Sequence, residues 1–248
     1  MSKQRFSNKL CKLFSMHSLE IIYVDEDLLI VNKPAGLLAV PGKGPDKADC
    51  LLSRICEQFP STLIVHRLDQ ATSGLMVFAR NALIQRALSK SFAAQEVQKT
   101  YLAVVQGNLS HSHSHSHNQS QSQEWQRIDS SLGADWPNRP KQKIDPQGKP
   151  STTLWRCIKT DEDSQTSVLL LKPLSGRTHQ LRVHLMSVGM PIIGDTLYSN
   201  ELNTDRAPQH SRMLLHAYEL VFSHPVGSGE MRFVVKPDFL DASVLAEL

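Results

Sequence analysis

Residues 66–79 read HRLDQATSGLMVFA, so that Arg67 and Asp69 stand two positions apart just before a run without charge. From Gly74 the run is apolar on both faces of an extended chain, which is typical of a central strand covered on both sides. These apolar neighbours place Asp69 at the margin of a core, where a carboxylate needs a cation or hydrogen bonds to stay ionised. Arg67 would project from the same face as Asp69, where its guanidinium could pair with that carboxylate or serve a ligand. The stretch therefore predicts a buried strand that begins beside a charged site.

Strands and helices are both expected around this central strand. β-Branched runs on either side of residues 25–27 predict a hairpin, and the prolines and glycines of NKPAGLL then place Lys33 on a loop at the hairpin's end. Asn81 is the expected N-cap of a helix that runs to about Gln95. The remaining expected elements are a helix over 50–58, strands over 100–107, 152–159, 166–172, 213–222 and 230–236, and a helix near 178–188. Many strands with few helices and no repeating strand–helix unit predict an α+β fold.

Composition excludes several classes of protein. The 248 residues are 40% hydrophobic and 21% charged, as in an ordinary globular protein, and no stretch approaches the roughly 18 apolar residues of a membrane span. The basic first residues lack the apolar core of a secretory signal, so a cytoplasmic protein is expected. Four irregularly spaced cysteines predict neither a disulfide framework nor a zinc ribbon. The net charge of +3 permits a nucleic-acid partner without selecting one.

The segment 110–123 is of low complexity. It contains HSHSHSHNQSQSQ and no apolar residue, so it cannot contribute to a core and is expected to be a disordered surface insertion. Its alternating histidines could bind a metal adventitiously, but flexible sites bind weakly, and no functional metal is expected there.

A second charged motif, GRTHQLRVHL, begins at Gly176. Leu181 and Leu185 mark the buried side of a helix, and Arg177 stands just before it. The helix macrodipole disfavours an arginine at this end, so an anion should compensate, which either a buried aspartate or a phosphate would do. A plain ion pair that joins two segments is an equally open interpretation.

Two further features suit contact with nucleic acid. Tyr101 begins the apolar strand of KTYLAVV, where its ring could stack on a base or simply pack in the core. A proline-rich stretch around DWPNRPKQK gathers basic residues beside an aromatic one, which favours contact with a nucleic-acid backbone, although a solvated loop remains open. Its residues are Trp136, Arg139, Lys141 and Lys143.

Six motifs, in order, resemble the RluA-type pseudouridine synthases: NKPAGLL, HRLDQATSGL, KTYLAVV, GRTHQLRVH, PIIGD and RMLLHAYEL. The resemblance implies one catalytic domain over residues 19–241, with a basic extension at 1–18, the insertion at 110–123 and no S4 module. It implies a curved mixed sheet in two halves with the active site in the cleft between them, acting as a monomer without cofactor or metal. DWPNRPKQK further resembles the dual-specificity subgroup, whose substrates are stem-loops of 23S ribosomal RNA and the anticodon stem-loop of tRNA.

Site residues follow from the same resemblance. Asp69 matches the catalytic aspartate, Arg177 is expected to pair with it, and Tyr101 to pack on the uracil and move its C5 proton. Arg67 matches the residue that enters the space left by the flipped nucleotide. The other RNA contacts that the resemblance implies are His66, Lys33, Arg182 and Leu214, together with the basic residues of the proline-rich stretch.

Two other functions are alternatives to the enzyme. An RNA-binding or RNA-remodelling protein on the same fold would need no catalysis, but the joint presence of Asp69, Tyr101 and Arg177 disfavours it. A nucleoside hydrolase would need a second carboxylate or a water-activating metal ligand, and no second acid accompanies Asp69 in these motifs.

Overall fold

The computed structural model describes residues 19–107, 109, 124–199, 211–227 and 229–248. The expected basic extension (1–18) and His/Ser insertion (110–123) lie outside these residues. The strands are β1 (Glu20–Val24), β2 (Leu28–Lys33), β3 (Leu63–Ile64), β4 (Ser73–Ala79), β5 (Gln98–Gln106), β6 (Gln126–Asp129), β7 (Leu132–Ala134), β8 (Gln142–Ile144), β9 (Thr152–Asp161), β10 (Thr166–Pro173), β11 (Leu215–Ser223) and β12 (Glu230–Val234). The helices are α2 (Leu51–Gln58), α3 (Ala82–Ala93), α4 (Gln180–Ser187) and α5 (Ala242–Leu245), with 3-10 turns η1 (Pro45–Lys47) and η3 (Trp136–Asn138).

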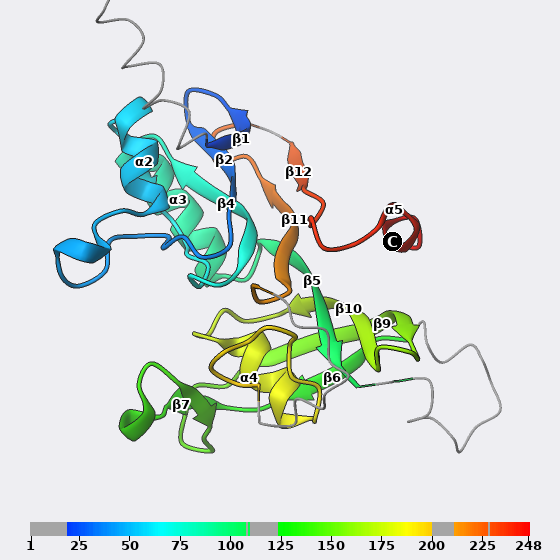
Figure 1. Ribbon diagram of the computed structural model, residues 1–248. Coiled ribbons are helices and arrows are strands. Elements are labelled where there is room, and N and C mark those ends of the chain that lie inside the picture. The colour runs from blue at the N-terminus through cyan, green and yellow to red at the C-terminus, as the bar shows by residue number, and fades with distance from the viewer. Residues whose placement is uncertain (1–18, 108, 110–123, 200–210, 228) are drawn as a thin grey trace, which may run out of the picture.

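One mixed sheet organises the molecule and confirms the predicted α+β class. Its strands run in the order β1-β2-β4-β11-β5-β10-β9-β6, with β12 paired to β11 and β3 to β4. Only the β4–β11 pair is parallel among these strands. Figure 1 shows two halves, one with β1, β2, β4, α2 and α3, the other with β9, β10, β6 and α4, joined by β11 and β5.

The central strand predicted from residue 74 is β4, and every residue of it is buried. Its side chains alternate between two core clusters, because successive residues of a strand point to opposite faces. Leu75 and Val77 pack in the cluster that includes Ile84 and Leu88 of α3. Met76 and Phe78 pack in the cluster that includes Leu51 and Ile55 of α2. The two helices therefore cover opposite faces of the strand, as the uninterrupted apolar pattern predicted.

Helix starts follow from local capping. The Asn81 side chain accepts a hydrogen bond from the Ile84 N–H (3.0 Å), which confirms the predicted N-cap of α3. Cys50 caps α2 in the same way, with Sγ 3.3 Å from the Ser53 nitrogen. These caps fix the ends of the two helices that flank β4.

Gly74 makes the parallel junction between β4 and β11 possible. Its φ of +112° is a left-handed conformation that residues with a Cβ rarely adopt. A Cβ at this position would lie 2.3 Å from the carbonyl oxygen of Ala217, its partner across the pair. The glycine of the opening motif thus lets a late strand of the chain dock beside an early one, immediately after the segment that carries Asp69.

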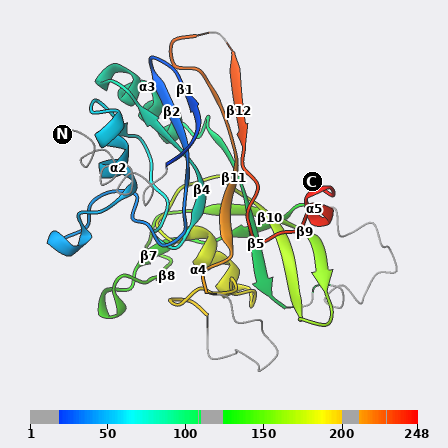
Figure 2. The same cartoon turned by 45° about the horizontal axis from the view of Figure 1, so that its top comes forward.

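Two local expectations need correction. Lys33 is the last residue of β2 and not part of a loop, because its backbone still pairs with Gly74 of β4. The proline-rich basic stretch is not irregular throughout: β7 and β8 form a two-stranded hairpin with η3 at its tip. Figure 2 shows this hairpin beside α4. No helix in the described part of the chain is long and apolar enough to span a membrane.

Candidate active site

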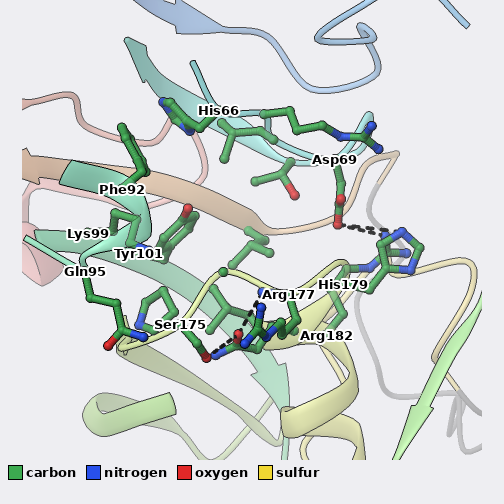
Figure 3. A pocket seen from close by; sticks show the side chains of 18 of the residues that line it. His66, Asp69, Phe92, Gln95, Lys99, Tyr101, Ser175, Arg177, His179 and Arg182 are labelled. Carbon is green, nitrogen blue, oxygen red and sulfur yellow. Dashed lines mark hydrogen bonds and ion pairs between the residues drawn. The ribbon is translucent and has the colours of Figure 1, made fainter. Parts of the chain in front are cut away.

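A cavity of about 470 Å³ lies between the two halves of the molecule. Its size is within the range of small-ligand pockets. Figure 3 shows the polar side chains that line it, contributed by the segment before β4, by β5 and by the turn that leads into α4. They include Asp69, Tyr101, Arg177, His179 and Arg182. Three motifs that are far apart in the sequence therefore meet at one cavity.

Asp69 presents its carboxylate at this cavity. The side chain is 22% exposed, so it is reachable from the pocket although it borders the core. One carboxylate oxygen lies 3.4 Å from a terminal guanidinium nitrogen of Arg182 and 3.9 Å from Nε2 of His179. The carboxylate thus has positive or N–H groups on one side and open space on the other, an arrangement that suits a nucleophile or a base.

The expected pair between Asp69 and Arg177 is wrong, because Arg182 holds that position. Arg177 is exposed, and its Nε donates to the carbonyl oxygen of Pro150 (3.2 Å). The helix begins only at Gln180, whose side-chain oxygen accepts from the backbone N–H of Arg177 (3.0 Å). Arg177 consequently lies on the turn before α4 at the rim of the pocket, whereas Arg182 lies in the first turns and faces inward.

Arg182 is also not the RNA contact that was expected, because its side chain is only 4% exposed. Its Nε and one terminal nitrogen each donate to Asp195 at 2.7 Å, in a bidentate pair. Burial lowers the pKa of Arg182, but the hydrogen bonds and charges of Asp195 and Asp69 outweigh burial and leave this pKa raised. The guanidinium is thus a fixed buried cation shared by two carboxylates.

Asp195 is held as firmly as its partner. The side chain is 1% exposed, and Oδ1 also accepts from the backbone N–H groups of Leu197 (2.9 Å) and Tyr198 (3.2 Å). This residue ends the PIIGD motif, to which sequence reasoning gave no role. Its place shows that the motif anchors the arginine that touches Asp69.

Tyr101 lies on β5 and lines the cavity, as Figure 3 shows. Its ring is partly buried and packs against core clusters of both halves. Burial, and secondarily the Asp69 carboxylate, raise the pKa of its hydroxyl, which is therefore protonated at neutral pH. Tyr101 therefore packs in the core and also lines the pocket, so core packing and contact with a base are compatible.

His66 forms a neutral wall of the pocket. Its Nε2 accepts from the Val77 N–H (3.1 Å), and its ring stacks on Phe92 at 4.6 Å. Burial, with a smaller effect from Lys99, lowers its pKa to about 3. His66 would therefore meet RNA as an uncharged aromatic surface rather than as a cation.

Arg67 is exposed and lines the cavity. Within the described residues its guanidinium makes no hydrogen bond or ion pair. An arginine in this state is available to a ligand, which leaves its expected role as a wedge a prediction.

Two other expected RNA contacts are buried. Lys33 is 0% exposed, and its ammonium donates to the carbonyl oxygens of Pro34, Leu37 and Gln70. Burial lowers its pKa to about 7, against an opposing effect of Asp69. Leu214 is 2% exposed in a core cluster, while its neighbour Leu215 lines the cavity. Lys33 therefore ties the loop that follows β2 to the Asp69 segment, and Leu214 supports the core.

The basic residues of the β7–β8 hairpin lie at the surface. Trp136 is 67% exposed, and the guanidinium carbon of Arg139 lies 3.7 Å from the centre of its ring. Lys143 is exposed and Lys141 is partly buried. The hairpin thus offers cations and an aromatic ring to solvent, as contact with an RNA backbone requires.

Lys99 and His179 line the cavity but were not assigned a role from sequence. Burial lowers the pKa of Lys99, and its ammonium makes no hydrogen bond or ion pair in the described part of the chain. Both residues stand inside motifs that carry the resemblance, KTYLAVV and GRTHQLRVH, so their position in the sequence was the available signal. Among the described residues, no group of three or more His, Cys, Asp or Glu side chains is placed to hold a metal ion.

Comparisons with known proteins match most of the chain. Residues 27–187 match a family model described as RNA pseudouridylate synthase. The chain is 40% identical over 220 residues to the dual-specificity RNA pseudouridine synthase RluA of Yersinia pestis, covering 88% of this chain and 99% of that protein. It is 39% identical over 222 residues to the protein of the same name from Escherichia coli strain K12, covering 89% and 94%.

Solved structures extend the comparison to the fold. Human RNA pseudouridylate synthase domain containing 1 matches with a TM-score of 0.70 at 29% identity, over 93% of this chain and 87% of that one. The human domain containing 4 matches with a TM-score of 0.67 at 21% identity, over 97% and 94%, and supports the fold alone. The family match over residues 27–187 and the identity of about 40% over most of these relatives show that this chain belongs to the RNA pseudouridylate synthase family.

Proposed function

We propose that this pseudouridine synthase isomerises uridines in stem-loops of both 23S ribosomal RNA and tRNA, and that Asp69 starts the reaction. The dual substrate range rests on the identity of about 40% to relatives that are named dual-specificity synthases. The observation that carries the catalytic assignment is the Asp69 carboxylate, open to the cavity and backed by the buried Arg182 guanidinium.

Isomerisation of uridine requires one carboxylate and a pocket that shields the reacting nucleotide. The bond between C1′ and N1 breaks, the uracil turns, C5 bonds to C1′, and the C5 proton is exchanged for a proton at N1, so nothing is added or lost overall. Asp69 can attack the sugar or remove a proton from it, and the geometry serves either route. Tyr101 is proposed to support the uracil through its ring and to carry the C5 proton through its hydroxyl.

Binding of the flipped nucleotide is assigned to the cations around the pocket. Lys99 and Arg177 line it without a carboxylate partner among the described residues, so they suit the phosphates next to the target uridine. Arg67 is proposed to fill the space that the uridine leaves in the stem, because its planar guanidinium can stack on bases. Arg67→Ala should then slow the reaction more on a folded stem-loop than on an unstructured RNA, and equal losses on both would argue against the wedge.

The decisive test is tritium release from RNA labelled at C5 of uridine. Two transcripts, one 23S stem-loop and one tRNA anticodon stem-loop, are incubated with the purified protein and with Asp69→Asn. Asp163→Asn, at an exposed turn between β9 and β10, is the matched control. We expect both RNAs to react with the unchanged protein and the control, and neither with Asp69→Asn. Release by Asp69→Asn would reject the catalytic assignment, and release from one RNA alone would reject dual specificity.

A further inference from the structure

His179 makes two polar contacts, one with Asp69 and one with Tyr198. Tyr198 in turn contacts the β7–β8 hairpin. Its Nδ1 lies 2.7 Å from the hydroxyl of Tyr198, and its Nε2 lies 3.9 Å from Oδ2 of Asp69. Its φ of +55° places it in the left-handed region, which is uncommon for a residue with a Cβ. Figure 3 shows the ring directed at the Asp69 carboxylate.

The Tyr198 hydroxyl decides which nitrogen of His179 carries hydrogen. This hydroxyl accepts from the backbone N–H of Gln142, the first residue of β8, at 2.6 Å. A phenol has one hydrogen of its own, and Nδ1 of His179 is the acceptor within reach of it. Donation of this hydrogen to Nδ1 pairs both groups, and it leaves the hydrogen of a neutral imidazole on Nε2.

The ring is neutral near neutral pH. Burial lowers the pKa of His179, and Arg182 and Arg67 act in the same direction, while Asp69 and Asp195 oppose them. A neutral ring with its hydrogen on Nε2 then points an N–H at Asp69. The distance of 3.9 Å is longer than a hydrogen bond, as catalytic contacts often are before the substrate binds.

Asp69 needs this second donor because Arg182 alone does not fix it. Two nitrogens of Arg182 are committed to Asp195 at 2.7 Å, and only one reaches Asp69, at 3.4 Å. A carboxylate held by a single long contact keeps rotational freedom about its side-chain bonds. A donor from another direction would fix its plane.

We propose that His179 is a positioning residue that aims the Asp69 carboxylate with its Nε2–H, in a tautomer set by Tyr198 and hence by the β7–β8 hairpin. The inference rests on the proposed role of Asp69 as the reacting group. The hairpin would then have two roles. Lys141 and Lys143 are expected to contact RNA, and Gln142 between them holds the Tyr198 hydroxyl. Docking of RNA on the hairpin would then bear on the geometry of the reacting carboxylate.

The tautomer is tested directly by nitrogen NMR of protein labelled with ¹⁵N-histidine. The His179 signals are identified by their loss in His179→Gln. We expect the Nε2–H tautomer at pH 7.5 in the unchanged protein and a mixture of tautomers in Tyr198→Phe. An Nδ1–H tautomer or an imidazolium in the unchanged protein would overturn the proposal.

The kinetic test separates chemistry from binding. His179→Leu should lower the single-turnover rate about ten- to a hundredfold, as loss of an outer-shell partner does for a metal ligand. The dissociation constant for RNA should change by less than about twofold, since the lost contact is made within the protein. His179→Gln, which keeps an N–H, should recover part of the rate, and Tyr198→Phe should show an intermediate loss.

Controls keep this inference distinct from the proposed function. Tyr218→Phe on β11 removes the hydroxyl of a residue that does not line the cavity, and it should leave the rate unchanged. Full activity of His179→Leu, beside an inactive Asp69→Asn, would reject the positioning role and leave the catalytic assignment intact. Activity of Asp69→Asn would instead reject the proposed function. If His179→Leu fails to fold, Tyr198→Phe and the NMR measurement decide the question.

Discussion

Two arginines of GRTHQLR, five positions apart, occupy opposite environments. Arg177 is exposed at the rim of the pocket, while Arg182 is buried between two carboxylates. The sequence could not tell them apart, because α4 buries six consecutive residues and shows no polar face from which to orient it. Asp195 makes the difference, because it pairs with Arg182. The sequence alone gives no sign of this contact.

The two arginines should therefore differ when each is replaced by methionine. Arg182→Met leaves the carboxylate of Asp195 buried without its cation, which should cost about 3–5 kcal/mol of unfolding free energy and abolish turnover. Arg177→Met should change stability by less than about 0.5 kcal/mol and mainly weaken RNA binding. Denaturant unfolding and tritium release would check both, and an Arg182→Met protein of normal stability would contradict the assigned network.

Tyr101→Phe separates the ring of this residue from its hydroxyl. Ring packing in both core clusters is retained, so stability and RNA affinity should change little. If the hydroxyl moves the C5 proton, the single-turnover rate should fall by about 10²–10⁴, the usual contribution of a general acid or base. A normal rate in a rapid-quench experiment would restrict Tyr101 to packing.

At the scale of elements, clear periodic patterns were predictable and short or wholly buried ones were not. The apolar residues on both faces of β4 and the N-cap of α3 correctly predicted the type and position of these two elements. The three-residue strands β7 and β8 are too short and too polar to show a period. Leu214 was expected to contact RNA but is buried, and its neighbour Leu215 lines the cavity, because successive residues of an extended chain point to opposite faces.

The junction of β4 with β11 yields a prediction at this scale. Gly74→Ala would place a Cβ in a left-handed residue and 2.3 Å from the Ala217 carbonyl oxygen. Because the obstacle is backbone, it cannot turn aside as a side chain would, and we expect a loss of more than about 2 kcal/mol. Gly36→Ala is a control with a positive φ but open space around the new Cβ. Equal losses in thermal unfolding of the two variants would show that φ alone matters.

For the whole molecule, buried neutral histidines predict a dependence of stability on pH. Burial lowers the pKa of His216 to about 4, and its Nε2 donates to the carbonyl oxygen of Val235 at 2.9 Å. The unfolded chain, with an ordinary value near 6.5, binds a proton that the folded chain does not bind until pH 4. The contribution of His216 is therefore complete above about pH 6.5 and is lost as the pH falls from there toward 4.

The expected slope is up to about 1.4 kcal/mol per pH unit for each such histidine. Denaturant unfolding between pH 4.5 and 7, compared with His216→Gln, would isolate the contribution of this residue. The variant starts from a lower stability but should lose less of it on acidification. A slope equal to that of the unchanged protein would show that another group takes up the proton.

The place of β11 has a consequence for how the molecule is made. This strand lies between β4 and β5 in the sheet, although it begins more than 100 residues after the end of β5. During synthesis from the N-terminus, β4 and β5 leave the ribosome with unpaired edges that only a much later segment can cover. Leu215, which lines the pocket, arrives with that segment. The nascent chain thus exposes unpaired strand edges until β11 has been translated, and the lining of the pocket is complete only then.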